Sequence, residues 1–151
     1  MKKTVLIITL VLIGILGCTK EKKTDFSMVN KWETTYLKIE MPTNMKSDST
    51  AVFEDTFENN PARIARSQYF ADGTFSAWFV DQQGKEFDKT KGTWKFKKDS
   101  LYVDFFYGGR SIQVAYEIIP TNNGFKGVSK FDWDEDGEYD DLLTMKTKIL
   151  K

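Results

Sequence analysis

The residues best suited to chemistry form an acidic run at positions 132–141. Asp132, Asp134 and Asp136 occupy positions 1, 3 and 5 of this run, and Gly137 at position 6 permits a sharp turn. Position 7 offers a backbone carbonyl and position 9 is again acidic, as in the first part of a calcium-binding loop. So many carboxylates in one turn repel one another unless a cation is bound. The run therefore predicts a calcium site; the alternative is a solvated acidic hairpin tip, because turns favour Asp and Gly without any metal.

The acidic run departs from the EF-hand, because position 12 is Leu143 and the flanking sequence is typical of strands. It resembles instead the calcium loops that join β-strands in integrin-type propeller repeats. This resemblance implies a structural calcium whose ligands are the side chains of Asp132, Asp134, Asp136 and Asp140 and the backbone carbonyl of Glu138. Asp141 is then expected as an outer-shell partner.

Other kinds of chemistry are limited by what the chain lacks. It has no histidine, and Cys18 is its only cysteine. Catalytic triads of the Ser-His-Asp kind, Cys-His nucleophiles and histidine-based metal sites are therefore excluded. Acid–base catalysis would depend on carboxylates, Tyr or Lys, and no carboxylate pair stands in an apolar setting. We expect no enzymatic activity and no catalytic residues.

The N-terminus reads as an export signal. Lys2 and Lys3 precede an apolar or small run over residues 4–17, and a lysine-rich segment follows. A membrane-spanning helix needs about 20 apolar residues, and this run is shorter. We expect residues 1–17 to be a signal peptide that is removed, leaving 134 of the 151 residues.

The end of this signal, residues 15–18, resembles the lipobox of bacterial lipoproteins. In that family the cysteine, here Cys18, is lipidated and becomes the new N-terminus, so the resemblance implies a stable membrane anchor. The alternative is a buried or reactive lone cysteine. Thr19 follows, in place of the Asp associated with inner-membrane retention, which favours the outer membrane, on its periplasmic or surface face.

Length and charge indicate one domain that does not bind nucleic acid. The 134 residues are enough for a single core. Loss of Lys2 and Lys3 leaves 20 basic against 22 acidic residues, without the basic excess that nucleic acid requires. Residues 18–27 are polar and lysine-rich, so we expect a lipidated tether there and the domain over residues 28–151.

The mature chain is dominated by strand patterns. Alternation is clearest over residues 110–120, and residues 101–107 show a similar apolar face, with Gly108 and Gly109 between them as a hairpin turn. In all, about eight strands are expected, as in an all-β barrel or sandwich. Residues 42–65 are the exception, because their acidic composition and Pro61 favour a loop or short helix over one mouth.

Trp32 near the start of the first strand, the hairpin at residues 70–75 and the strand at residues 92–96 together resemble the small lipocalin-like domains found behind lipoprotein signals in Gram-negative bacteria. The resemblance spans residues 28–150. It implies an antiparallel, eight-stranded, up-and-down barrel or near-barrel whose interior holds a small apolar ligand. It does not identify the ligand or the residues that bind it.

Two functions stay open for such a domain. Either the barrel binds a small hydrophobic ligand, or its 12 Phe and 4 Trp residues fill the interior and it acts as an accessory to an envelope complex. Trp32 and Trp94 are expected to pack the barrel floor. An enzyme is the third possibility.

Two tripeptides, at residues 48–50 and 99–101, resemble the Asp-Ser/Thr-apolar acceptor for O-glycosylation in some such bacteria. The tripeptides are Asp48-Ser49-Thr50 and Asp99-Ser100-Leu101. Sequences this short also occur by chance.

Overall fold

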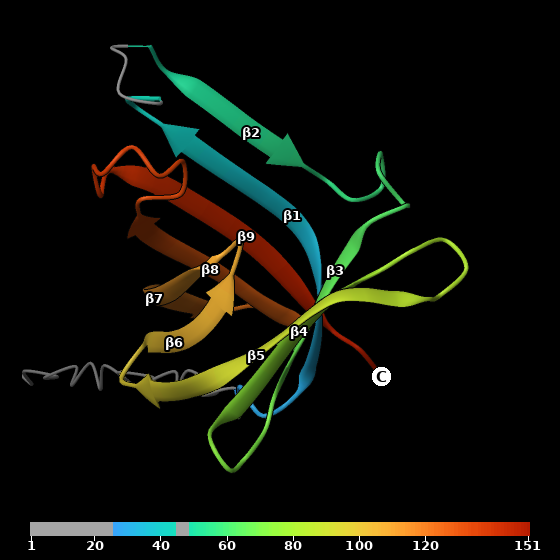
Figure 1. The fold of residues 1–151 in the computed structure, drawn as a ribbon. Coiled ribbons are helices and arrows are strands. Elements are labelled where there is room, and N and C mark those ends of the chain that lie inside the picture. Colours follow the sequence, from blue (N-terminus) through green and yellow to red (C-terminus); the bar gives the residue numbers. More distant parts are fainter. Residues whose placement is uncertain (1–25, 45–48) are drawn as a thin grey trace, which may run out of the picture.

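The computed structural model describes residues 26–44 and 49–151, and these form an all-β domain (Figure 1). Eight strands close into an antiparallel barrel and a ninth, β2, is added to it, which confirms the predicted fold class. The strands are β1 (Lys31–Met41), β2 (Ala51–Asp55), β3 (Ile64–Tyr69), β4 (Thr74–Val80), β5 (Glu86–Lys97), β6 (Ser100–Tyr107), β7 (Arg110–Pro120), β8 (Gly124–Phe131) and β9 (Asp141–Ile149). The described residues include no helix, and hence none long and apolar enough to cross a membrane.

Strand β1 closes the barrel and also widens it at one end. Along one edge it pairs with β9 from Trp32 to Glu40. Along the other edge its first residues pair with β3 and its last residues, from Leu37 to Met41, pair with β2. Strands β1 and β3 therefore diverge beyond Glu33, and in Figure 1 the β1–β2 pair leans away from β3 and the β4–β5 hairpin.

The segment 42–65 corrects the sequence analysis. We expected a loop or short helix, but Ala51–Asp55 forms β2. The strand exists because β1 offers an unpaired edge once β3 has turned away, and this long-range pairing outweighs weak local propensity. Strands β3 and β5 likewise begin earlier than expected, at Ile64 and Glu86.

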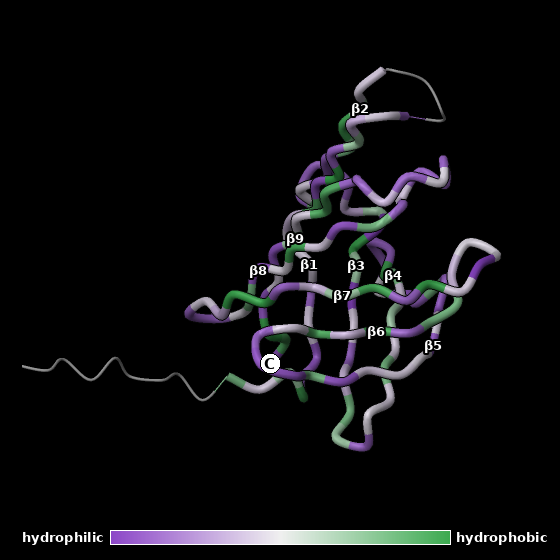
Figure 2. Tube along the Cα trace, turned by 90° about the vertical axis from the view of Figure 1, so that its left-hand side faces the viewer, coloured by the Kyte–Doolittle hydropathy of each residue, from purple (hydrophilic) through white to green (hydrophobic). Residues whose placement is uncertain are grey.

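The central hairpin follows the sequence pattern closely. Along β7, buried and exposed residues alternate from Ser111 to Ile118. Figure 2 shows both hydrophobic and hydrophilic positions along this strand. Gly108 and Gly109 join β6 to β7 with φ angles of 62° and 87°, a conformation that L-residues with side chains avoid. This turn fixes the register in which Tyr107 faces Arg110.

Aromatic side chains pack together at the end of the barrel where β1 begins. Trp32 is 1% exposed, its ring lies 4.9 Å from that of Phe125, and its indole N–H donates to the carbonyl of Met28. Phe26, which the sequence placed in the tether, packs against Trp32 and Phe96. These contacts close one end of the barrel, here called the floor.

Candidate functional site

The barrel contains a cavity of about 470 Å³ above the floor. Its walls come from β1 to β7, β9 and the loops between them, and they are mainly apolar. The aliphatic and aromatic side chains that line it include Leu37, Ile39, Phe57, Phe75, Val103, Ile112, Trp133, Leu143 and Met145. Exposed residues Asn60, Arg63 and Asp88 also line it, so the cavity reaches the surface at this rim. An apolar interior with a polar rim is typical of a small-molecule site.

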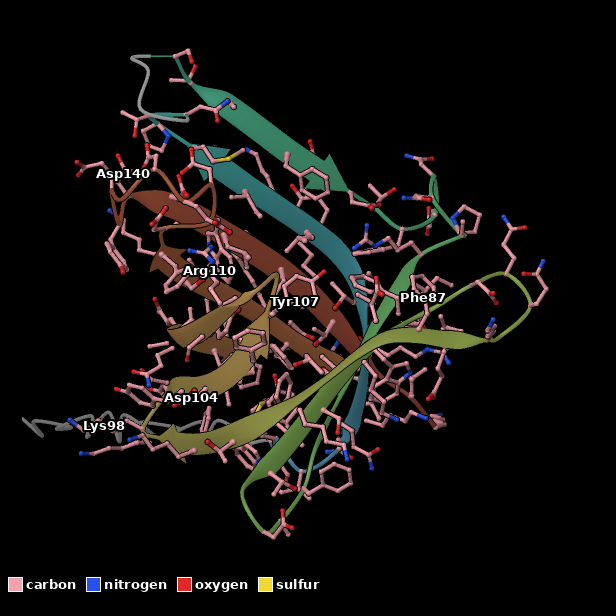
Figure 3. All side chains as sticks on the ribbon, viewed as in Figure 1. Phe87, Lys98, Asp104, Tyr107, Arg110 and Asp140 are labelled. Carbon is pink, nitrogen blue, oxygen red and sulfur yellow. The ribbon has the colours of Figure 1, made fainter. Side chains whose placement is uncertain are left out.

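Arg63 is held at the rim by aromatic side chains. Its guanidinium lies 4.2 Å from the ring centroid of Phe79, and its Nη2 lies 3.4 Å from the hydroxyl of Tyr107. In Figure 3, Tyr107 stands at the end of β6. This arrangement presents a positive charge at the mouth of an apolar space.

Arg66, the second cation on the cavity wall, is neutralised. Its Nη2 and Nε donate to the same Glu33 oxygen, Oε2, at 2.9 and 3.0 Å. Lys148 contacts the other oxygen at 2.9 Å. Burial raises the pKa of Glu33, but the hydrogen bonds and charges of Lys148 and Arg66 outweigh it and leave that pKa below its ordinary value. The ion pairs of Glu33 with Arg66 and Lys148 therefore join β1, β3 and β9 where the barrel closes.

Two tyrosines add hydroxyl groups to the apolar walls. Tyr69 and Tyr116 both line the cavity and are almost completely buried. Burial raises the pKa of each phenol, so both stay protonated at neutral pH. They can offer hydrogen bonds to a ligand but no charge.

A candidate metal centre, the triad of Asp132, Asp134 and Asp141, lies at the β8–β9 connection. One carboxylate oxygen from each residue lies within 4.8 Å of the others. Asp132 follows β8 directly and Asp141 begins β9, where it pairs in register with Phe131. The start and end of the connection therefore meet. Such a set of hard oxygens fits calcium.

Two buried oxygens of the triad, one on Asp132 and one on Asp141, have no hydrogen-bond partner among the described residues. Oδ1 of Asp132 and Oδ1 of Asp141 accept no hydrogen bond from the described residues, although the two side chains are only 7% and 1% exposed. Asp141 Oδ2 accepts from the backbone N–H groups of Trp133 and Asp134, at 2.6 and 3.2 Å. Burial and the charges of Asp134 and Asp140 raise the pKa of Asp141 despite these bonds. Unpartnered buried carboxylate oxygens are costly, and a cation would satisfy them.

The other predicted ligands lie elsewhere in the loop. Asp136 accepts hydrogen bonds from the Thr43 hydroxyl at 3.0 Å and from the Glu138 backbone N–H at 2.8 Å. Glu138 itself is exposed. Asp140 is half-buried and lies outside the triad, although its Oδ1 is also buried without a described partner. The triad thus combines two predicted ligands, Asp132 and Asp134, with the residue expected in the outer shell.

Arg110 supports the loop and was missed by the sequence analysis. Its Nη2 donates to the backbone carbonyl of Asp132 at 2.8 Å, and its Nε lies 3.2 Å from the carboxylate of Glu135. Figure 3 places Arg110 and Asp140 on the same side of the barrel. Its position after Gly109 was the available signal, because an up-and-down topology brings the β6–β7 turn and the β8–β9 loop to one end of the barrel.

Trp133 belongs to both the loop and the cavity. It stands between Asp132 and Asp134, and its side chain lines the cavity, 4.9 Å from the ring of Phe131. Its indole nitrogen is buried without a partner among the described residues.

Trp32 packs in the floor, as predicted. Trp94 is half-buried and bonds through its indole N–H to the carbonyl of Phe70 at 2.9 Å. Neither is among the residues that line the cavity.

Cys18, together with the predicted signal peptide and most of the tether, lies outside the described residues. The sequence matches no protein-family model, and no curated protein matches it.

Proposed function

We propose that this protein is a lipocalin-like binding protein, anchored in the cell envelope, that holds a small apolar ligand in its barrel. One observation carries the proposal: the cavity of about 470 Å³ with apolar walls. Small-molecule pockets typically measure about 300–1,000 Å³. A barrel filled by its own side chains would leave no such space.

Binding, rather than catalysis, is the activity that the cavity residues support. The polar groups of the cavity wall include the hydroxyls of Tyr69 and Tyr116, whose pKa values burial raises, and Arg66, which is paired with Glu33. Because burial raises the pKa of both phenols, neither tyrosine is an activated nucleophile or a base poised near neutral pH.

The test is displacement of a fluorescent fatty acid from the unlipidated mature chain, residues 18–151 with Cys18→Ser. We expect saturable binding at one site and competition by unlabelled apolar compounds. Binding that never saturates, or that is not displaced, would contradict the proposal.

We also propose that calcium binds at the β8–β9 loop, as a structural ion. The supporting observations are the three carboxylates within 4.8 Å of one another and the buried oxygens of Asp132 and Asp141. Terbium is the probe, because Trp133 and the exposed Tyr139 lie in the same loop and would sensitise its emission. The ion site would be contradicted if the protein sensitised no terbium emission, or if calcium did not compete that emission away.

The proposed location rests on the sequence around Cys18. A thioether lipid there would anchor the domain, with the outer membrane favoured by Thr19. The first described residues pack in the floor, through Phe26 and Met28, so a tether of a few residues would separate domain and lipid.

A second candidate function, as an accessory to an envelope complex, is favoured by the outer edge of β2. In the described part of the chain β2 ends the sheet, and its Val52 and Phe53 are 59% and 47% exposed. An unpaired edge with apolar residues can accept another strand. Native electrophoresis of solubilised envelopes should show the protein in a large complex, and Val52→Lys should dissociate that complex. Migration of the unsubstituted protein and of Val52→Lys as monomers would remove this candidate.

A further inference from the structure

We propose that calcium at the Asp132–Asp134–Asp141 triad strengthens ligand binding in the barrel cavity, with Trp133 as the shared element. This inference rests on the proposed function and adds a regulation to it. The ligand site and the ion site would then be two sites with a coupling free energy between them.

The backbone around Trp133 is tied to all three members of the triad. Its neighbours on both sides, Asp132 and Asp134, contribute carboxylates to the triad. Its backbone N–H donates to Oδ2 of the third member, Asp141, at 2.6 Å. A cation that draws the three carboxylates together would therefore restrain the backbone of Trp133 through both of its neighbours in sequence and through Asp141.

Trp133 and the strand that begins at Asp141 also form part of the cavity wall. The side chain of Trp133 lines the cavity, and so do Leu143 and Met145, which follow Asp141 at intervals of two along β9. Residues two apart share one face of a strand. An ion that orders Trp133 and the start of β9 would thus order one wall of the cavity.

An independent observation points to a ligand at the triad. Oδ1 of Asp132 and Oδ1 of Asp141 are buried and, among the described residues, have no hydrogen-bond donor. The nearby Arg110 contacts the carbonyl of Asp132 and the carboxylate of Glu135. Arg110 therefore supports the loop without a hydrogen bond to either of these two oxygens, and a divalent cation would satisfy both.

The linkage follows from thermodynamics. Without calcium, repulsion among the carboxylates leaves the wall free to sample other positions, and a ligand must order it on binding. With calcium bound, that ordering has already occurred. Coupling between sites typically changes affinity by roughly 5- to 150-fold, and it is reciprocal, so the ligand must raise calcium affinity by the same factor.

The experiment measures the dissociation constant of a fluorescent fatty acid on the unlipidated mature chain, first in chelator and then in saturating calcium. Magnesium at equal ionic strength controls for screening, because it is smaller and demands stricter geometry. We expect binding to be tighter in calcium by a factor within the range above. The converse titration, terbium emission with and without saturating fatty acid, should give the same factor.

Matched variants locate the coupling. Asp134→Asn, at a half-buried triad position, should abolish the calcium effect, whereas Glu138→Gln, at an exposed position of the same loop, should keep it. Trp133→Ala should retain calcium binding but lose the coupling. Calcium binding to this variant is measured by competition with terbium, whose emission Tyr139 can still sensitise. Circular dichroism checks that each variant folds.

The outcomes separate the inference from the proposed function. No saturable probe binding under any condition overturns the proposed function and, with it, the coupling. Saturable probe binding with unchanged affinity, while terbium reports a filled ion site, overturns only the coupling. Saturable probe binding without any ion binding overturns the ion site and the coupling and leaves the apolar ligand site standing.

Discussion

The backbone N–H of Trp133 lies 2.6 Å from Oδ2 of Asp141 and donates a hydrogen bond to it. This bond joins the first turn of the β8–β9 loop to the first residue of β9. Because Trp133 also lines the cavity, an acidic loop at the barrel end and an apolar space inside the barrel share one residue. That relationship motivates the first of the predictions.

Calcium should raise the melting temperature of the full chain through the triad. At a calcium concentration about 100 times its dissociation constant, the stabilisation would be about 2.7 kcal/mol. Asp134→Asn should remove this shift. Asp136→Asn should keep it, because Asp136 bonds to Thr43 and Glu138 and lies outside the triad. Differential scanning calorimetry measures both variants. A shift that Asp136→Asn also removes would restore Asp136 to the ligand set, as expected from sequence, and a shift kept in Asp134→Asn would contradict the triad.

A bulky residue inside the cavity should block the ligand. Ala77 lines the cavity on β4, whereas Ala115 is exposed on β7. Ala77→Phe should weaken binding of the fluorescent fatty acid roughly tenfold or more, equivalent to about 1.4 kcal/mol or more. Ala115→Phe is the matched control and should bind normally. Equal affinities for the two variants, both folded by circular dichroism, would place the ligand outside the cavity.

The stability of the folded domain should depend on the packing of Trp32 in the floor. Because this side chain is 1% exposed and packs against Phe125, Trp32→Ala should lower the free energy of unfolding by about 3–5 kcal/mol. Phe106→Ala removes an aromatic ring that is 62% exposed and should change it by about 0.5 kcal/mol or less. Urea unfolding compares them, and similar losses in the two variants would contradict the assigned floor.

Acid should weaken the ion pairs of Glu33. Because its pKa is lower in the folded protein than the ordinary value of 4.5, its contribution to stability is complete above that value. The contribution is lost as the pH falls through the folded pKa. Glu33→Gln should therefore cost about 1.5–3 kcal/mol near pH 7 and much less near pH 3. Urea unfolding at the two pH values tests this, and a cost that does not change with pH would contradict it.

Lipidation should depend on Cys18. With Cys18→Ser, a chain grown with labelled palmitate should carry no label and should leave the membrane fraction. Thr19→Ser is the control and should remain labelled. Labelling of the Cys18→Ser chain would refute the anchor.

The strands that sequence predicted best are those with local signals. The alternation over β7 and the two glycines before it state both the buried face and the turn, and no distant residue is needed to interpret them. Strand β2 carries no such signal. It forms because β1 has an unpaired edge beyond Glu33, which depends on where β3 diverges.

The acidic loop illustrates the same limit at the site. Spacing located the loop and found Asp132 and Asp134, but Asp141 entered the triad because it begins β9 with its side chain buried. Which of two adjacent aspartates points inward depends on strand register. Arg110 lies 22 residues from Asp132 in sequence, and only the topology brings them together.

The position of the floor determines how the barrel would be oriented relative to a membrane anchor. The chain enters at Phe26 beside Trp32, whereas the polar rim with Asn60 and Arg63 lies at the far end of the barrel. If lipid holds the chain ahead of Phe26, the floor of the barrel would face the anchoring bilayer and the rim would open away from it. Cargo would then be exchanged with the aqueous compartment or with a facing membrane, not drawn from the lipids directly beneath.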